Sequence, residues 1–320
     1  MIMLMDDIFI VFCLTMLGLV LGSFAGATVW RIRAWQLTGD RERLGELSAK
    51  KKASLSDDEQ EELADLIASK KEMTADLKTL NSLAGRKVSN DRSECLHCHR
   101  QLAWYDMIPL VSWLSTGGKC RYCKKAIGVF EPLIEIGMAL TLVVLYVFWP
   151  YPLDSIPAAL ELLAWMASAL ILIILFAYDL KWFLLPNVPV FVFIGFGFVV
   201  SSLHIYQAPS LEGALVSVAG GVAILSGVYA LLWYISRGAW IGFGDVKLGL
   251  GLALLLSDWQ LAFIALFLAN FIGCIVVFPG MLSGKISRTT RIPFGPLLII
   301  GTFIALFAGR AIIDWYSSLL

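Results

Sequence analysis

The feature that most limits how this chain can fold is the run from Ile8 to Trp30, which contains no charged residue. About 20 apolar residues are enough for a helix to cross the hydrocarbon core of a bilayer. The residues before the run are Asp6 and Asp7, whereas a secretory signal begins with basic residues. We therefore expect a first transmembrane helix that is retained in the mature protein.

The composition agrees with a chain that lies mostly in a membrane. Hydrophobic residues make up 58% of the 320 positions and charged residues only 16%, whereas soluble domains carry about 25% charged residues. The apolar segments predict further spans at 133–149, 156–177, 188–206, 212–235, 246–257, 260–279 and 293–313. The segment 246–257 is too short to cross alone. We expect an all-α polytopic membrane protein with about eight transmembrane helices.

The basic residues are distributed unevenly, and their distribution predicts the orientation of the chain. If the N-terminus lies outside, all Lys and Arg residues except Arg310 fall on the cytoplasmic side of the membrane. An excess of Lys and Arg in cytoplasmic loops is the usual rule for membrane proteins. The formal net charge of zero also argues against a general nucleic-acid partner.

The one sizeable polar region follows the first span and divides the chain into parts. In its first portion, leucines recur at helical spacing, and Ser56 and Glu59 have the spacing of a capping box. This portion is expected to form a charged helical hairpin. The expected parts are a first transmembrane helix at 1–30, a charged cytoplasmic helical insert at 31–90, a cytoplasmic metal-binding module at 91–130 and a multi-helix membrane domain at 131–320.

Four cysteines in the second portion of the polar region have the spacing of a metal site. Two C-x2-C pairs can each present two sulfurs to one zinc ion, which gives a zinc-ribbon-like insert. His97 and His99 lie beside the first pair and could compete as ligands. The four cysteines form the simplest complete ligand set, and such a site is structural because it leaves no open position for water. The expected ligands are Cys95, Cys98, Cys120 and Cys123.

Two further cysteines, Cys13 and Cys274, lie alone within apolar spans. Free cysteines of this kind usually behave as small apolar residues. We expect both to be core residues rather than ligands.

Two aspartates lie at the ends of predicted spans, where ionisable residues are costly and usually functional. Asp179 ends one span and Asp245 opens another, and the predicted topology brings both to the cytoplasmic edge. Two neighbouring carboxylates tend to share one proton, which is the arrangement of aspartic proteases. The alternative is that both are interfacial anchors that pair with Lys181 and Lys247.

Glycines and prolines surround this predicted pair. Gly242 and Gly244 precede Asp245 and allow close approach of a backbone or a substrate. Gly295 lies between two prolines in the segment that enters the last span, which predicts a fixed non-helical entry close to the aspartates.

Several segments, in the same order along the chain, resemble the bacterial type IV prepilin peptidases, which are bifunctional leader peptidases and N-methyltransferases. The GxGD motif around Asp245 alone would be weak, because presenilin-like intramembrane proteases share it. The segments that carry the resemblance are GLVLGSFAGATVWRIR, RSECLHCHRQLAWYDMIPLVSWLSTGGKCRYCKKAIG, EPLIE, AYDLKWFLLPN, GFGDVKLGLGLALLL and RIPFGPLLIIGTFIAL.

The resemblance implies a GxGD aspartic endopeptidase of the bacterial inner membrane, surrounded by lipid. It would cut the basic leader from type IV prepilins or type II secretion pseudopilins after a glycine, at the cytoplasmic face. Asp179 and Asp245 match the two catalytic positions, and the four cysteines match the zinc positions. S-adenosylmethionine would then supply a methyl group for the new N-terminus. One departure from the family pattern is LLPN, ending at Asn187, where LPD is common.

Other functions remain open on the residues alone. The protein could be a peptidase without methyltransferase activity. It could instead be a transporter in which the aspartates relay protons, or a scaffold for pilus assembly that needs neither carboxylate. The substrates, the oligomeric state and the role of residues 36–90 do not follow from the sequence.

Overall fold

The computed structural model describes residues 5–50, 55–80, 83, 92–284 and 292–319. Parts of the predicted insert, at 51–54, 81–82 and 84–91, and of the predicted basic loop before the last span, at 285–291, lie outside the described residues. The described chain is helical, apart from two isolated antiparallel bridges, and this confirms the all-α class. It divides into two compact units, Met1–Gly22 with Ile136–Leu320 and Ser23–Glu135.

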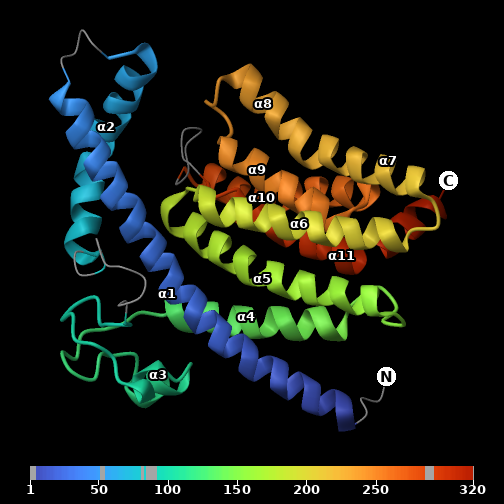
Figure 1. Ribbon diagram of the computed structural model, residues 1–320, viewed down its shortest axis with the longest axis horizontal. Helices are drawn as coiled ribbons and strands as arrows, with labels where there is room; N and C mark the ends of the chain where they lie inside the picture. The colour runs from blue at the N-terminus through green and yellow to red at the C-terminus, as the bar shows by residue number, and fades with distance from the viewer. Residues whose placement is uncertain (1–4, 51–54, 81–82, 84–91, 285–291, 320) are drawn as a thin grey trace. The chain divides into compact units, whose positions relative to one another are not determined.

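The helices follow one another in the order shown in Figure 1. They are α1 (Met5–Ala49), α2 (Asp57–Leu80), the 3-10 helix η3 (Trp104–Met107), α3 (Val111–Ser115), α4 (Phe130–Val147), α5 (Ile156–Trp182), α6 (Asn187–Gln207), α7 (Leu211–Val222), the π-helical turn η4 (Ala223–Gly227), α8 (Val228–Ser236), α9 (Phe243–Leu256), α10 (Trp259–Leu282) and α11 (Gly295–Ser317).

Seven helices of the described chain are long and apolar enough to cross a membrane. They are α1, α4, α5, α6, the continuous helix Leu211–Ser236, α10 and α11. The remaining predicted span corresponds to α9, which has 14 residues and is about 21 Å long. Since a bilayer core is about 30 Å thick, α9 is too short to cross alone, as its sequence indicated.

Helix α1 does not end at the predicted boundary near Trp30. It continues to Ala49 because no proline interrupts it and its charged second half is rich in good helix formers such as Leu, Glu and Arg. The apolar half of the helix favours lipid and the charged half favours water, but both halves have a high tendency to be helical.

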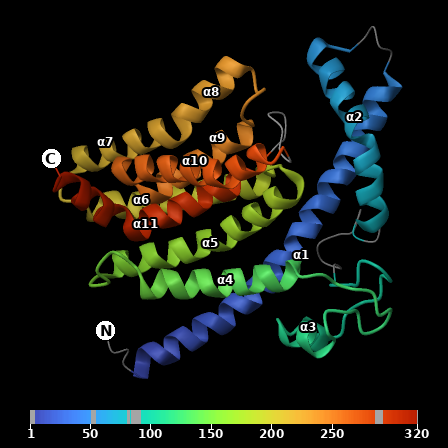
Figure 2. The same cartoon turned by 180° about the vertical axis from the view of Figure 1, so that it is seen from behind.

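Helix α9 lies at the centre of the first unit. It contacts α6, α7, α8, α10 and α11, and most of its residues between Val246 and Leu256 are buried. Figure 2 shows the same helices from behind. Because longer helices surround α9, its apolar side chains form the middle of the main hydrophobic core.

Two glycines allow the backbones around α9 to approach closely. A Cβ on Gly249 would lie 2.3 Å from the carbonyl oxygen of Leu225, in the π-helical turn η4. A Cβ on Gly197 of α6 would lie 3.0 Å from the carbonyl oxygen of Gly251. Small residues at such crossings are typical of membrane helices, where van der Waals contact is a main source of stability.

The second unit contains the expected helical hairpin, formed by the end of α1 and by α2. Ala34 and Leu37 pack against Met73 and Leu80, and all four are buried. The predicted capping box at the start of α2 is confirmed. The backbone N–H of Ser56 donates to Glu59 Oε2 at 3.2 Å, and that of Glu59 donates to Ser56 Oγ at 3.3 Å.

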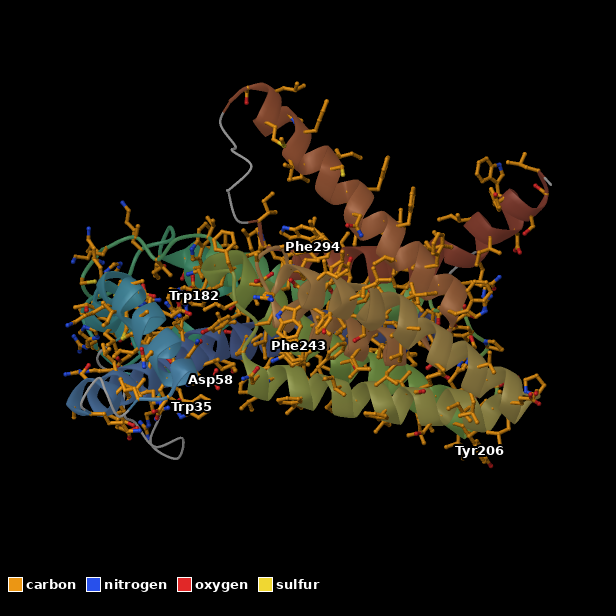
Figure 3. The ribbon with its side chains drawn as sticks, turned by 90° about the horizontal axis from the view of Figure 1, so that it is seen from above. Trp35, Asp58, Trp182, Tyr206, Phe243 and Phe294 are labelled. Carbon is orange, nitrogen blue, oxygen red and sulfur yellow. The ribbon has the colours of Figure 1, made fainter. Side chains whose placement is uncertain are left out.

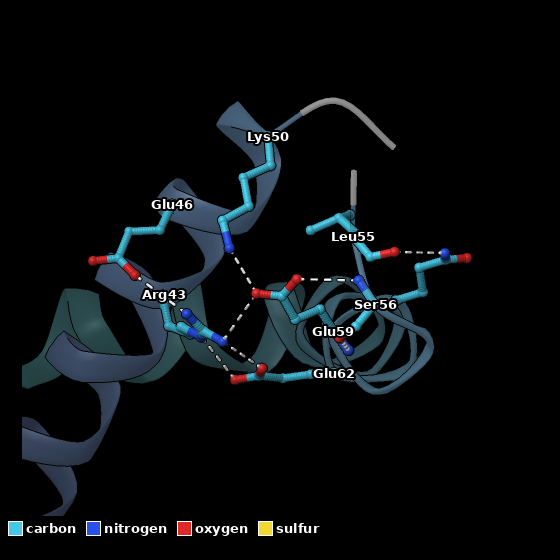
Figure 4. Close-up of polar contacts among 8 residues, drawn as sticks. Arg43, Glu46, Lys50, Leu55, Ser56, Glu59 and Glu62 are labelled. Atoms are coloured by element: carbon cyan, nitrogen blue, oxygen red, sulfur yellow. Dashed lines mark hydrogen bonds and ion pairs between the residues drawn. The ribbon is translucent and has the colours of Figure 1, made fainter. Parts of the chain in front are cut away.

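Ion pairs line the outside of this hairpin (Figure 4). Arg43 donates two hydrogen bonds to Glu62, at 3.0 and 3.1 Å, and Lys50 reaches Glu59 at 2.6 Å. These side chains are largely exposed, so each pair contributes little to stability. They join the end of α1 to the first turns of α2.

The contact of Gly249 with the η4 backbone predicts a sharp cost for adding one methyl group. Gly249→Ala should lower the free energy of unfolding by about 1–3 kcal/mol, because a carbonyl oxygen cannot rotate away as a side chain can. Gly195→Ala is the matched control, since a Cβ there meets nothing within 4 Å. Thermal unfolding in detergent measures both. Equal melting temperatures for the two variants would contradict the close approach.

Candidate active site and metal centre

Asp179 lies one turn before the end of α5, and its side chain is enclosed. The residue is only 4% exposed. Phe183 ends the helix in a left-handed conformation, with its N–H donating to the Asp179 carbonyl. The carboxylate accepts a hydrogen bond from the backbone N–H of Gly295 at 3.0 Å. A buried carboxylate with a backbone donor is held in one orientation.

Gly295 is the first residue of α11, so Asp179 faces the N-terminus of that helix. A helix N-terminus carries partial positive charge and favours an anion. A Cβ on Gly295 would lie 2.8 Å from Asp179 Oδ2 and 3.4 Å from Leu248 Cδ2. There is room here only for glycine, which explains the residue between the two prolines of this segment.

Asp245 lies in the first turn of α9, three residues after the N-cap Gly242. Its carboxylate accepts a hydrogen bond from the Gly242 N–H, as the third residue of a capping box does. Gly244 makes room for the connection between α5 and α6, because a Cβ there would lie 3.1 Å from Leu185 Cβ. The GxGD spacing therefore places the carboxylate at the helix N-terminus and lets the α5–α6 connection pack against Gly244.

The two aspartates lie in the same unit and interact electrostatically. Asp179 belongs to the end of α5 and faces the N-terminus of α11, whereas Asp245 lies in the first turn of α9. Aromatic residues adjoin both, and Figure 3 labels Trp182, Phe243 and Phe294 at the end of α5, the start of α9 and the N-cap of α11. The sequence predicted this pair from the ends of two spans, and the structure brings the two residues together.

The lysines near the aspartates have other neighbours. Lys247 donates to the side-chain oxygen of Asn187, the first residue of α6. The amine of Lys181 lies over the Trp182 ring at 5.6 Å. These contacts do not favour the interpretation that the aspartates are anchors for the two lysines.

A polar pair that the sequence did not predict lies beside the site. Tyr229 is 2% exposed, and its hydroxyl accepts a hydrogen bond from Asn270 Nδ2 at 3.2 Å. The Tyr229 ring meets that of Phe294, and the charge of Asp245 acts on its hydroxyl. The one feature of the sequence that could have predicted this pair is Asn270, because an amide within a strongly apolar span needs a hydrogen-bond partner.

This arrangement can perform general acid–base chemistry. Carboxylates that interact in apolar surroundings do not both ionise easily, so one proton is shared between them. The ionised group can then take a proton from water while the protonated one donates a hydrogen bond to a carbonyl.

The four predicted ligand cysteines form a compact cluster in the second unit. Their sulfurs all lie within 4.8 Å of one another, and those of Cys95 and Cys123 are 3.9 Å apart. Sulfurs bound to one tetrahedral ion at about 2.3 Å are separated by about 3.8 Å. The cluster can therefore hold one ion of tetrahedral preference.

The two halves of the cluster are built alike. The N–H of Cys95 donates to the Arg100 carbonyl, and that of Cys120 donates to the Lys125 carbonyl. His99 and Lys124, each four residues after the first cysteine of its pair, have positive φ angles of 56° and 59°. The His99 ring lies 3.5 Å from Glu94 Oε1, so its Nδ1 is turned toward a carboxylate rather than toward the sulfurs.

The thiols of this cluster share their protons unequally. Burial raises the pKa of Cys120, but backbone N–H groups of Cys123 and Tyr122 and the thiols of Cys95 and Cys123 outweigh it, so the pKa is lowered to about 7. Burial raises the pKa of Cys95 to about 12. A thiolate at Cys120 is the form that a metal ion binds.

The expectation that Cys13 and Cys274 are core residues is wrong, because both side chains are exposed. An apolar residue on a membrane-spanning helix can face lipid tails as favourably as protein. The apolar pattern therefore does not tell the core of such a helix from its lipid-facing side.

The chain matches two family models, in the order of its two halves. Residues 16–149 match the bacterial peptidase A24 N-terminal domain, and residues 166–278 match the type IV leader peptidase family. No solved structure matches the chain.

Curated relatives match over most of their length. The chain is 33% identical to a prepilin leader peptidase/N-methyltransferase of Stutzerimonas stutzeri, over 70% of this chain and 74% of the relative. It is 31% identical to a protein of the same name from Pseudomonas aeruginosa, over 96% of this chain and 93% of the relative. A Bacillus subtilis relative of that name is 28% identical, over 70% of this chain and 85% of the relative. The chain therefore belongs to the type IV prepilin leader peptidase family.

Proposed function

We propose that this protein is a membrane aspartic endopeptidase that removes the leader from type IV prepilins or type II secretion pseudopilins. The observation that carries the proposal is the pair of carboxylates, Asp179 and Asp245, at two helix N-termini in a member of this family. The proton-relay transporter is not favoured by these relatives.

In the proposed mechanism one aspartate is ionised and the other protonated. The ionised carboxylate takes a proton from a water molecule, whose oxygen attacks the scissile carbonyl carbon. The protonated carboxyl donates a hydrogen bond to the carbonyl oxygen and stabilises the charge that develops there. A proton then passes to the leaving nitrogen, and the peptide bond breaks. The Gly295 N–H keeps the Asp179 carboxylate in place throughout.

The proposed location is the bacterial inner membrane, with the N-terminus outside and the cysteine module in the cytoplasm. The distribution of Lys and Arg supports this orientation. It brings Asp179 and Asp245 to the cytoplasmic face. A basic leader followed by an apolar helix would present its scissile bond at this face, with the leader in water and the helix in lipid.

We propose that the four-cysteine cluster binds zinc. Four thiolates in a tetrahedral arrangement are a typical structural zinc site, and the N–H groups directed at Cys95 and Cys120 help to stabilise their negative charge. With four protein ligands, the ion would have no open position for water. Its chemistry would be to fix the fold of the module.

We extend the proposal to methylation of the new N-terminus with S-adenosylmethionine, on the names of the relatives. The polar insert contains no G-x-G-x-x-G sequence. We assign no residue to this step, and the peptidase proposal does not depend on it.

Replacing either aspartate by its amide should abolish cleavage. Asp179→Asn and Asp245→Asn should each lower the rate of leader removal by about 10³-fold or more, because an amide can neither accept nor release the proton. Mass spectrometry of a prepilin treated with purified enzyme would read the cut site and any methyl group together.

The control for this test is Glu161→Gln. Glu161 is also a buried acid of α5, but it lies near the other end of that helix. The Glu161→Gln variant should cleave the prepilin as fast as the unchanged enzyme. If the two aspartate variants also cleave normally, the catalytic assignment is wrong.

Gly295→Ala should separate positioning of the carboxylate from general stability. The added methyl group must displace Asp179 Oδ2, so we expect cleavage to fall about 10- to 100-fold. Gly301→Ala is the control, because its Cβ would meet the backbone of Ala265 and Ala269 on α10, away from the aspartates. Equal activity per folded molecule in the two variants would contradict this role of Gly295.

Cys120→Ser should remove the metal. The purified protein should contain about one zinc per chain and the variant almost none, because three remaining thiolates bind the ion much more weakly. Elemental analysis measures the content, and Cys274→Ser provides a control cysteine outside the cluster. Full zinc content in the Cys120 variant would overturn the four-cysteine assignment.

A further inference from the structure

The segment between the two cysteine pairs carries large apolar side chains that no other part of its unit covers. Trp104, Val111 and Leu114 are 73%, 59% and 68% exposed, and Ile108 is 38% exposed. We call these four residues the η3–α3 patch. Val111 and Leu114 are three residues apart on α3, so they share one side of it.

The segment that carries the patch has no outward charge of its own. Asp106 is the one charged residue between Leu102 and Gly118. Its carboxylate is turned to the second cysteine pair, where it accepts hydrogen bonds from Arg121 Nε at 2.8 Å and Tyr122 Oη at 3.2 Å. The patch is thus an apolar surface whose one acid is already paired.

Two hydrogen bonds fix this segment, one to the second turn of α4 and one to the chain just before it, and α4 is long and apolar enough to span the membrane. The N–H of Leu110, at the start of α3, donates to Glu135 Oε2 at 2.8 Å. The Trp113 indole donates to the carbonyl of Gly128 at 2.6 Å. Glu135 lies five residues inside α4, so the backbone next to the patch lies beside the membrane-spanning part of that helix.

Helix α1 gives a second measure of depth. Glu135 also bonds to the side chain of Ser23, which belongs to the uncharged run of α1. Arg31, the first charged residue after that run, lies eight residues further on, or about 12 Å along the helix axis. The Leu110 backbone is therefore at a level that is two turns inside the charged end of the span.

The charges on the rest of the module suit the surface of a membrane. Between residues 92 and 128 there are six Lys and Arg residues against two Asp and Glu residues. Exposed Lys and Arg side chains lie on both cysteine pairs, and Arg100 and Arg121 stack over tyrosine rings. Basic residues beside exposed Trp and Leu are typical of segments that lie in the headgroup region of anionic bilayers.

We propose that the η3–α3 patch inserts into the bilayer at the face where α1 becomes charged. The apolar side chains would enter the boundary between headgroups and acyl chains, and the basic residues of the cysteine module would contact anionic lipid phosphates. The module then rests in the membrane surface rather than hanging free beneath it. The occupant of the patch is lipid, and the proposal is independent of the peptidase reaction.

Photo-cross-linking of the full-length protein in nanodiscs tests this directly. The photoreactive residue p-benzoylphenylalanine replaces Leu114 in one variant and Lys124, an exposed residue of the second cysteine pair, in the other. The nanodiscs contain phosphatidylethanolamine and phosphatidylglycerol. Phospholipid adducts found by mass spectrometry should be roughly fivefold or more abundant at position 114 than at position 124.

Three results would decide the matter. Adducts at position 114 that decrease when phosphatidylcholine replaces phosphatidylglycerol would support both the insertion and the role of the basic residues. Equal, low lipid yields at the two positions would show that the patch faces water and would overturn the proposal. A conjugate of two protein chains at position 114 would overturn it as well, because a second copy would then cover the patch. Unchanged melting temperatures would confirm that both variants are folded.

Discussion

The length of α9 is the constraint on which the rest of the membrane unit depends. A helix of 14 residues cannot cross the bilayer, so it is stable there only because longer helices surround it. Glycines at the crossings allow the backbones to touch, as at Gly249 and Gly197. The first turn of α9, with Asp245, is consequently held where α5 ends and α11 begins. This position brings the Asp245 carboxylate under the influence of Asp179, and two carboxylates that interact do not both ionise easily.

The sequence predicted the features that depend on local patterns. Apolar runs marked the spans, the spacing of Ser56 and Glu59 marked the start of α2, and the paired cysteines marked the cluster of four sulfurs. It could not predict contacts between distant segments, such as that of Tyr229 with Asn270, because they depend on how helices pack. It also misjudged which faces are covered, since apolar side chains suit both lipid and protein surroundings.

The departure from the family pattern at Asn187 has a physical meaning. The Asn187 side chain accepts a hydrogen bond from Lys247, two residues after Asp245. An aspartate at this position would form an ion pair with Lys247 and would place another carboxylate near Asp245. The amide keeps the contact with Lys247 but adds no negative charge. The local packing of the α6 start against α9 is thus maintained without a further negative charge beside Asp245.

The positions of the two cysteine pairs along the chain have a consequence for residues that are not ligands. Cys98 and Cys120 enclose the whole η3–α3 segment, so an ion bound by both pairs closes this stretch of chain into a loop. A single loop closure restricts the conformations of the whole enclosed stretch in the unfolded module, and so lowers its conformational entropy. Loss of the ion would therefore make Trp104 and Leu114 less ordered, as well as the four cysteines. The supply of metal to the cell would then decide whether the newly made chain can order its surface at the bilayer.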